Sequence, residues 1–104
     1  MRKIESEMIA AIQAGKAFLK DNTEVIPTHV LGETEADDFD VMNVLLHGND
    51  IASVFDAGTA DEFTTVNVST LRTWPTRTTM SRLRALGVDV CTRKGEVLLN
   101  GETI

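Results

Sequence analysis

The middle of this chain lacks lysine and arginine. Neither residue occurs between Lys20 and Arg72 in a sequence of 104 residues. The same stretch holds eleven carboxylates: Asp21, Glu24, Glu33, Glu35, Asp37, Asp38, Asp40, Asp50, Asp56, Asp61 and Glu62. The lysines and arginines lie on either side of it, and the formal net charge is −6. Charge sorted along the sequence in this way is informative about surfaces and partners, but it names no reaction.

Cysteine and long apolar runs are also scarce. The single cysteine, Cys91, excludes an internal disulfide and suits a reducing cytoplasm. No apolar run approaches the roughly 18 residues of a membrane-spanning helix. The charged residues Arg2, Lys3, Glu5 and Glu7 interrupt the N-terminus, so we expect no signal peptide. These features favour a cytoplasmic protein that does not contact a membrane.

Recognisable catalytic motifs are missing as well. The sequence has no glycine-rich phosphate loop, no pair of Cys or His at zinc spacing and no Gly-x-Ser-x-Gly. Its two histidines, His29 and His47, are far apart, and His47 stands beside a glycine in an expected tight turn. The acidic run at 37–40 lacks the oxygen pattern of a calcium loop and is interpreted as solvated charge. We therefore expect no catalytic residue, no metal site, no cofactor and no enzymatic activity.

The clearest helix is predicted over residues 4–20. Its apolar side chains recur at a period of about 3.6 residues and form one stripe. They are Ile4, Met8, Ala11, Ile12, Gly15, Phe18 and Leu19. Asp21-Asn22 ends this helix. Residues 23–30 are β-prone, and Pro27 confines that strand to an edge or breaks it.

The acidic middle contains two predicted loops, at 31–40 and 56–62. Strands are expected at 41–46 and 51–55, and the turn at His47-Gly48-Asn49 joins them into a hairpin. Residues 63–69 alternate in polarity and predict another strand.

A short second helix is predicted at about 77–86, capped by Thr76 or Thr78 and ended by Gly87. A hairpin follows, with strands at 88–92 and 96–99. The order of elements predicts a single α+β domain over residues 1–104. We expect an antiparallel sheet of five to six strands, with the N-terminal helix and the short second helix packed on one face.

One internal echo is present. Residues 44–51 align without gaps on residues 97–104, and both segments begin Val-Leu-Leu and carry glycine at the same place. A generic strand followed by a turn is the preferred interpretation, and duplication of an α-β-β unit is the alternative. Only three residues follow the second glycine, so we expect no complete second hairpin.

One candidate surface is basic and combines the second helix with the hairpin behind it. Its residues are Trp74, Arg77, Ser81, Arg82, Arg84, Arg93 and Lys94. A helix followed by a hairpin is similar to the recognition helix and wing of a winged helix, and hydroxyls at a helix start suit phosphate contacts. Against this, the sequence pI is about 4.7 and the segment ahead of the helix is predicted as strand. The alternative is that these arginines pair with the chain's own acids.

The other candidate surface is acidic. It is expected to form from the two loops through Glu33, Glu35, Asp37, Asp38, Asp40, Asp61 and Glu62. Such an array is phosphate-like and would attract a basic groove on another protein. Ordinary solubilising charge is the alternative.

Several short strings give the chain a wider resemblance. They include Leu46-His47-Gly48-Asn49, Trp74-Pro75-Thr76, Ser81-Arg82-Leu83 and Leu99-Asn100-Gly101. Through them the chain resembles a group of small uncharacterised proteins of T7-like tailed bacteriophages. It departs from that group at 37–40 and 57–62, which are longer and more acidic. The resemblance implies a phage accessory protein in the cytoplasm of an infected bacterial host, and it supplies no catalytic residues.

Together these observations predict a non-enzymatic phage accessory protein that binds a host macromolecule, with a host protein as the first choice. An acidic inhibitor of that protein is the sharpest form of the hypothesis. The alternative is a small nucleic-acid-binding protein that uses the Arg77–Arg84 helix and the Arg93–Lys94 hairpin. Pairing of edge strands across a two-fold axis would also allow a homodimer.

Overall fold

The computed structural model describes residues 2–104, except for the side chain of Glu35. Its helices are α1 (Lys3–Ala14), α2 (Val68–Thr73) and α3 (Arg77–Ala85), with a 3-10 turn η1 (Glu35–Asp37). Its strands are β1 (Phe18–Lys20), β2 (Thr23–Val30), β3 (Phe39–Leu46), β4 (Asn49–Phe55), β5 (Phe63–Val66), β6 (Val90–Arg93), β7 (Glu96–Leu99) and β8 (Glu102–Thr103). None of the described helices is long and apolar enough to cross a membrane.

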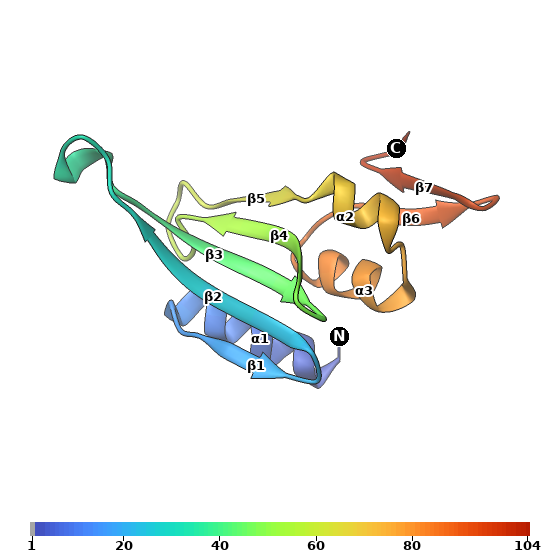
Figure 1. The fold of residues 1–104 in the computed structure, drawn as a ribbon, viewed down its shortest axis with the longest axis horizontal. Helices are drawn as coiled ribbons and strands as arrows, with labels where there is room; N and C mark the ends of the chain where they lie inside the picture. The colour runs from blue at the N-terminus through green and yellow to red at the C-terminus, as the bar shows by residue number, and fades with distance from the viewer. Residues whose placement is uncertain (1) are drawn as a thin grey trace.

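The predicted α+β class is confirmed. The first five strands form one antiparallel sheet in the order β1-β2-β3-β4-β5, and β6-β7-β8 form a second, smaller antiparallel sheet. The chain is elongated, with principal extents of 48 × 27 × 24 Å. Figure 1 shows β2 and β3 running out to the loop between them at one end of the long axis, while β6 and β7 lie at the other end.

Helix α1 ends earlier than its periodic apolar stripe predicts. Gly15 follows Ala14 in the left-handed conformation (φ 67°) and donates its N–H to Ile12 O at 3.1 Å, which is a common way to end a helix. The chain then turns back as β1, where Phe18 pairs with Val25. The apolar stripe continues past the helix because Phe18 reaches the same core from a strand.

The segment at 63–69 is also divided differently from the prediction. Strand β5 ends at Val66, and Asn67 caps a further helix, α2, by accepting a hydrogen bond from Thr70 N at 3.0 Å. The alternation of polar and apolar residues predicts the strand correctly but extends it through this cap. The side chain of an Asn can cap the start of a helix, and here Asn67 begins a helix where the alternation alone predicts more strand. A helix therefore does precede α3.

The predicted hairpins and the second helix are confirmed. His47 and Gly48 have φ values of 53° and 78°, the paired positive angles of a tight hairpin turn that the right-handed strand twist favours. Helix α3 is capped by Thr76, whose hydroxyl accepts from Thr79 N at 3.1 Å, and Gly87 follows its end with φ 89°.

The internal echo has the same local structure in both copies. The segment at 97–104 makes a strand, a turn at Asn100-Gly101 with φ values of 53° and 83°, and the two-residue strand β8. This copy forms only a short hairpin, as expected, because its second strand β8 has two residues paired with β7.

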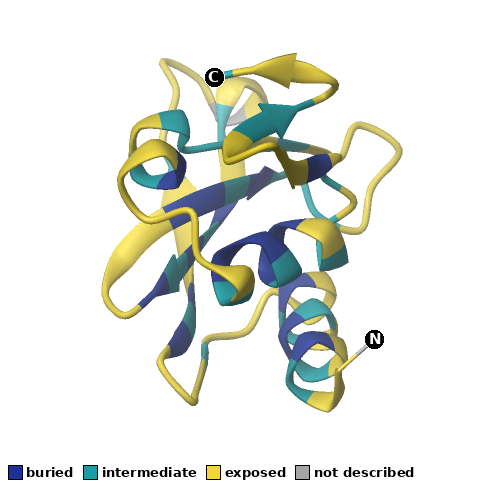
Figure 2. Cartoon of the chain, turned by 90° about the vertical axis from the view of Figure 1, so that its right-hand side faces the viewer, coloured by how far each residue is buried: buried dark blue, intermediate teal, exposed yellow. Residues whose placement is uncertain are grey.

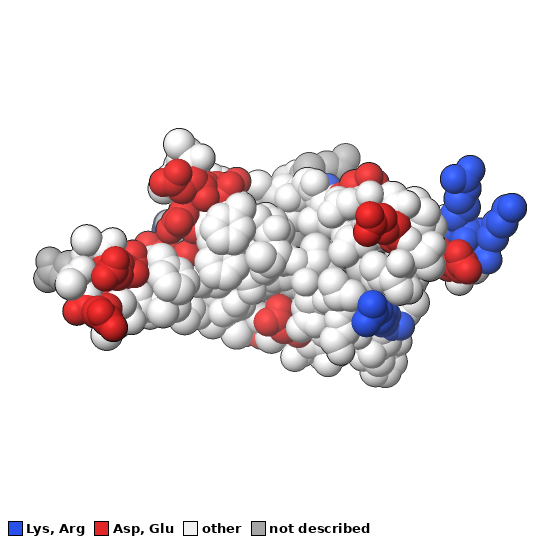
Figure 3. Space-filling model, turned by 90° about the horizontal axis from the view of Figure 1, so that it is seen from above, with Lys and Arg blue, Asp and Glu red and all other residues white. Residues whose placement is uncertain are grey.

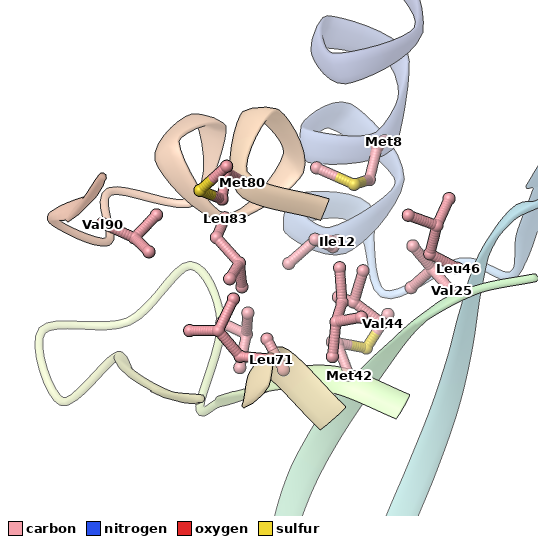
Figure 4. Close-up of a cluster of buried hydrophobic side chains, with 13 residues drawn as sticks. Met8, Ile12, Val25, Met42, Val44, Leu46, Leu71, Met80, Leu83 and Val90 are labelled. Carbon is pink, nitrogen blue, oxygen red and sulfur yellow. The ribbon is translucent and has the colours of Figure 1, made fainter. Parts of the chain in front are cut away.

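One core lies between the larger sheet and the helices. Met8 and Ile12 of α1, Met80 and Leu83 of α3 and Leu71 of α2 converge on β3 residues such as Val44 (Figure 4). Figure 2 shows the buried positions gathered where the helices face the strands. Both helices predicted to cover one face of the sheet therefore do so. The opposite face, whose side chains alternate with those of the core, consists mainly of half-buried and exposed residues.

Candidate functional site

The predicted acidic surface lies at one end of the molecule. The loops at 31–38 and 56–62 both adjoin the end of the sheet from which β2 and β3 project (Figure 1). Figure 3 shows carboxylates gathered at that end, whereas lysine and arginine project at the opposite end with further carboxylates beside them. Most of the predicted residues are exposed: Glu33, Asp37, Asp40, Asp61 and Glu62, with Asp38 half-buried. The side chain of Glu35 lies outside the described part of the chain. We call this region the acid end.

His29 fixes the base of the first acidic loop. Its Nδ1 lies 2.7 Å from Asp40 Oδ1, and its Nε2 lies 3.3 Å from Asp38 Oδ2. Hydrogen bonds to Asp40 and then to Asp38 raise the pKa of His29 above its usual range. Asp38 Oδ1 also accepts a bond from Gly32 N at 2.8 Å, and Gly32 must be glycine because a Cβ there would collide with Asp37. Hydrogen bonds to the carboxylates of the loop therefore hold its conformation.

The second loop is tied to α1 by Glu62. Its Oε1 accepts from Gly58 N and from Gln13 Nε2, each at 2.9 Å. The bond from Gly58, with that from Gln13, lowers the pKa of Glu62. These hydrogen bonds favour the ionised form of the Glu62 carboxylate.

The acidic residues of the middle segment are not paired with lysine or arginine. His29 is the basic side chain that the described residues place against two of them, Asp38 and Asp40. Among the described residues, no lysine or arginine forms an ion pair with any carboxylate between residues 21 and 62. The pairs made by lysine and arginine are Lys20 with Glu7 and Arg82 with Glu5. The alternative in which the arginines pair with the chain's own acids holds for Arg82, which pairs with Glu5, but among the described residues no arginine pairs with a carboxylate between residues 21 and 62.

The predicted basic surface is only partly exposed. Arg93 and Lys94 stand at the tip of the β6–β7 hairpin, and Arg77 is exposed at the start of α3. Arg84 is exposed too, but its Nε donates to Val90 O at 2.9 Å and so links α3 to β6. Figure 3 shows the blue side chains of this end projecting away from the rest of the molecule.

Arg82 and Ser81 require a correction, because they face α1 rather than a partner. Arg82 is 4% exposed, and its Nη1 lies 2.8 Å from Oε2 of Glu5, which is 3% exposed. Its Nε donates to Thr23 Oγ1 at 3.0 Å. Ser81 Oγ donates to the same Glu5 oxygen at 2.6 Å. We call these four residues the buried polar cluster, and it joins α1, β2 and α3.

The buried polar cluster also controls the ionisation of Glu5. Burial alone would raise the pKa of Glu5, but the hydrogen bonds from Ser81 and Arg82 outweigh it, and the pKa lies below its ordinary value. The sequence carries a signal for this site. Glu5 stands three residues before the core residue Met8, and Arg82 stands three after the buried Thr79, so each falls on an inward helical face.

Helices α2 and α3 lie on either side of a short turn and are followed directly by the β6–β7 hairpin. The sequence predicts strand, and no helix, directly ahead of α3, whereas the structure has the helix α2 there. This order of helix, turn, helix and hairpin is the order of a winged helix. It places Trp74, which is 55% exposed, at the turn between the two helices.

A cleft of about 370 Å³ lies beside that turn. Its lining residues are Leu46, His47, Asn49, Ile51, Thr70, Trp74, Thr76, Thr78 and Thr79. Two strings of the phage resemblance, at 46–49 and 74–76, thus meet in one place although they are distant in sequence. Sequence reasoning places His47 in a turn but does not bring it to Trp74. Among the described residues, no three His, Cys, Asp or Glu side chains are grouped so that they could hold a metal ion.

Comparison with known protein families gives a match over most of the chain. The model of a family described as Kyanoviridae Gp96 protein matches residues 1–103. No curated protein and no solved structure matches the chain. The match confirms that the chain is a phage protein but does not confirm the T7-like group, because Kyanoviridae are cyanophage myoviruses.

Proposed function

We propose that this chain, which belongs to the Kyanoviridae Gp96 protein family, is a non-enzymatic phage accessory protein that binds a host protein. Its place of action is the cytoplasm of the infected bacterial cell. The acid end is the contact, and the host surface is basic.

The observation that carries this proposal is the unpaired charge of the acid end. Exposed carboxylates such as Glu33 and Asp61, which form no ion pair among the described residues, repel their acidic neighbours, and this repulsion opposes folding. A basic partner removes the repulsion and gains charge-assisted hydrogen bonds. The long axis of 48 Å keeps the acid end well beyond a screening length of about 8 Å from Arg93 and Lys94. An approaching basic surface is therefore steered to one end.

An inhibitor of a nucleic-acid-binding host protein is the form of this function that the charge supports best. The carboxylates of two loops present negative charge over a projecting end, as phosphates do along a nucleic acid. A host groove lined with lysine and arginine would accept that array in place of its own ligand.

Capture from host lysate at low salt tests the proposal. The bait is the wild-type chain, and the test variant is Glu33→Gln with Asp61→Asn, two exposed residues whose side chains make no hydrogen bond in the described structure. The matched control is Asp89→Asn with Glu102→Gln, which removes the same charge from exposed positions near the other end. We expect a stoichiometric partner that wild type and control retain and the test variant loses. Absence of any stoichiometric partner, or equal capture by both variants, contradicts the proposal.

Nucleic-acid binding is the second candidate, and the arrangement of α2, α3 and the β6–β7 hairpin favours it. Arg77, Arg93 and Lys94 would be its phosphate contacts, without Arg82. Anisotropy titrations against single- and double-stranded DNA and RNA decide it. Affinity should fall with salt and with Arg93→Ala plus Lys94→Ala. No binding at about 100 μM, the weak end of the non-specific range, eliminates this candidate.

A further inference from the structure

Three phenylalanines share the face of the larger sheet that the helices do not cover. Strand pairing aligns Val41 of β3 with Phe55 of β4, and Phe55 with Phe63 of β5. Val41, Phe55 and Phe63 therefore form one row across the three strands. Phe39 stands two residues before Val41 and therefore on the same face. We call Phe39, Phe55 and Phe63 the aromatic patch.

The rings of the aromatic patch are in contact with one another. Phe55 and Phe63 are stacked with centroids 4.6 Å apart and planes 4° apart. Phe39 is tilted by 35° to Phe55 at 6.0 Å. Cross-strand aromatic pairs of this kind stabilise a sheet, and this accounts for part of their presence. It does not account for their exposure.

The aromatic patch is open to solvent. Phe63 is 53% exposed and Phe39 is 36% exposed, and Phe55 between them is half-buried. The described helices pack against the opposite face, through Met42 and Val54, which are the neighbours of Val41 and Phe55 in sequence. A contiguous exposed aromatic surface on a sheet is typical of a docking site.

The acid end surrounds this patch in sequence and lies at the same end of the sheet. Asp38 precedes Phe39, Asp56 follows Phe55, and Glu62 precedes Phe63. Within β3, Asp40 points to the opposite face, where it bonds to His29, and Glu62 turns toward Gln13 of α1, so the charge lies around the end of the sheet rather than beside the rings. No lysine or arginine occurs anywhere between Lys20 and Arg72 to offset them.

We propose that the aromatic patch docks an apolar segment of a partner protein that also carries lysine or arginine. The apolar side chains of the segment cover the rings, and its basic side chains extend past the end of the strands to exposed carboxylates of the two loops, such as Glu33 and Asp61. A cation beside an exposed ring is attracted by the ring face as well. This inference rests on the proposed function, and it names the partner chemistry that the acid end alone leaves open.

Charge complementarity selects this occupant over two others. A second copy of the chain on the same face would bring the same carboxylates against each other, because a two-fold contact places like surfaces together. A nucleic acid offers bases to stack on the rings, but its phosphates meet the acid end. A segment that carries both apolar and basic side chains can cover the rings and pair with the carboxylates.

The test uses two short labelled peptides of equal charge, one in which Leu and Lys alternate and one in which Ser replaces each Leu. Anisotropy titrations at low salt compare wild type with Phe63→Ser and with Phe39→Ser. The matched control is Leu19→Ser, which removes an exposed apolar side chain (72% exposed) from β1 on the same face. Thermal unfolding verifies that each variant is folded.

We expect wild type to bind the Leu-Lys peptide about tenfold more tightly than the Ser-Lys peptide. Phe63→Ser and Phe39→Ser should each reduce that preference severalfold and leave the affinity for the Ser-Lys peptide unchanged, and Leu19→Ser should change neither. Equal, salt-sensitive affinity of wild type for both peptides overturns the aromatic docking site and leaves the acid end in place. Failure of both peptides to bind at low salt counts against the acid end itself, and so against the proposed function. A preference for the Leu-Lys peptide that survives both phenylalanine variants also overturns the docking site.

Discussion

The buried polar cluster and the acid end contain the same carboxylate chemistry in opposite environments. Glu5 is 3% exposed and is bonded to an arginine and a serine, whereas Glu33 and Asp61 are exposed and pair with no lysine or arginine of the described chain. A buried charge without its partner is costly, while an exposed charge is close to neutral for stability. The difference separates the charges that hold this fold from those that are available for binding.

The largest expected effect comes from breaking the buried polar cluster. Arg82→Ala leaves Glu5 and Thr23 buried without their donor, so we expect the free energy of unfolding to fall by about 3–5 kcal/mol. Urea denaturation measures it. Arg77→Ala, an exposed residue on the same helix, is the matched control and should change stability by less than about 0.5 kcal/mol. Equal effects of the two substitutions would show that the cluster does not hold the helices together.

A double substitution sharpens the same point. Arg82→Met alone leaves the carboxylate of Glu5 unpaired in the interior, but Arg82→Met with Glu5→Met removes both charges and keeps the volume filled. We expect the double variant to regain at least about 1 kcal/mol over Arg82→Met, since an apolar pair often replaces a buried ion pair well. Chemical denaturation of the two single variants and the double variant completes the cycle. Purely additive losses would mean that the two charges are not coupled.

The pH dependence of stability follows from the lowered pKa of Glu5. A lowered folded-state pKa contributes stability that is present above the ordinary value of 4.5 and is lost as pH falls through the folded value. We expect the melting temperature to drop steeply on that acid side. Glu5→Gln should flatten this part of the profile, although it starts from a lower stability. If the melting temperature of the Glu5→Gln variant depends on pH in the same way as that of wild type, the acid sensitivity belongs to other groups.

The smallest expected effect lies at the acid end, where His29 titrates in the opposite sense. Its raised pKa contributes stability that is present below the ordinary value of 6.5 and is lost as pH rises through the folded value. NMR titration should give a pKa for His29 above 6.5, and Asp40→Asn should lower it more than Asp38→Asn, because Asp40 makes the larger contribution. The reverse order would contradict the geometry at the base of the loop.

Short-range sequence rules predict most of the helices, strands and turns. The features that they miss depend on contacts between segments distant in sequence. The turns at His47-Gly48 and Lys94-Gly95 and the cap at Thr76 lie where short-range rules place them. The end of α1 at Gly15 is missed because an apolar stripe does not distinguish a helix from a strand that returns to the same core.

The candidate site likewise has one part that the sequence predicts and parts that it does not. The acidic loops could be predicted, because a dense run of carboxylates is solvated unless a partner is supplied. The burial of Arg82 could not be predicted from α3 alone, since it depends on Glu5, which is distant in sequence. The aromatic patch was missed for a related reason. Phe39, Phe55 and Phe63 meet only through the pairing of three strands.

We expect the acid end, and not the buried polar cluster, to make the contact with a basic host protein. Capture by the wild-type chain is measured while ionic strength is raised from about 0.01 M to about 1 M, where the screening length falls from about 30 Å to about 3 Å. A stoichiometric partner should be lost steeply over this range while the chain remains folded. A partner retained at the highest salt, or captured equally by the Glu33→Gln with Asp61→Asn variant, would show that the acid end is not the contact.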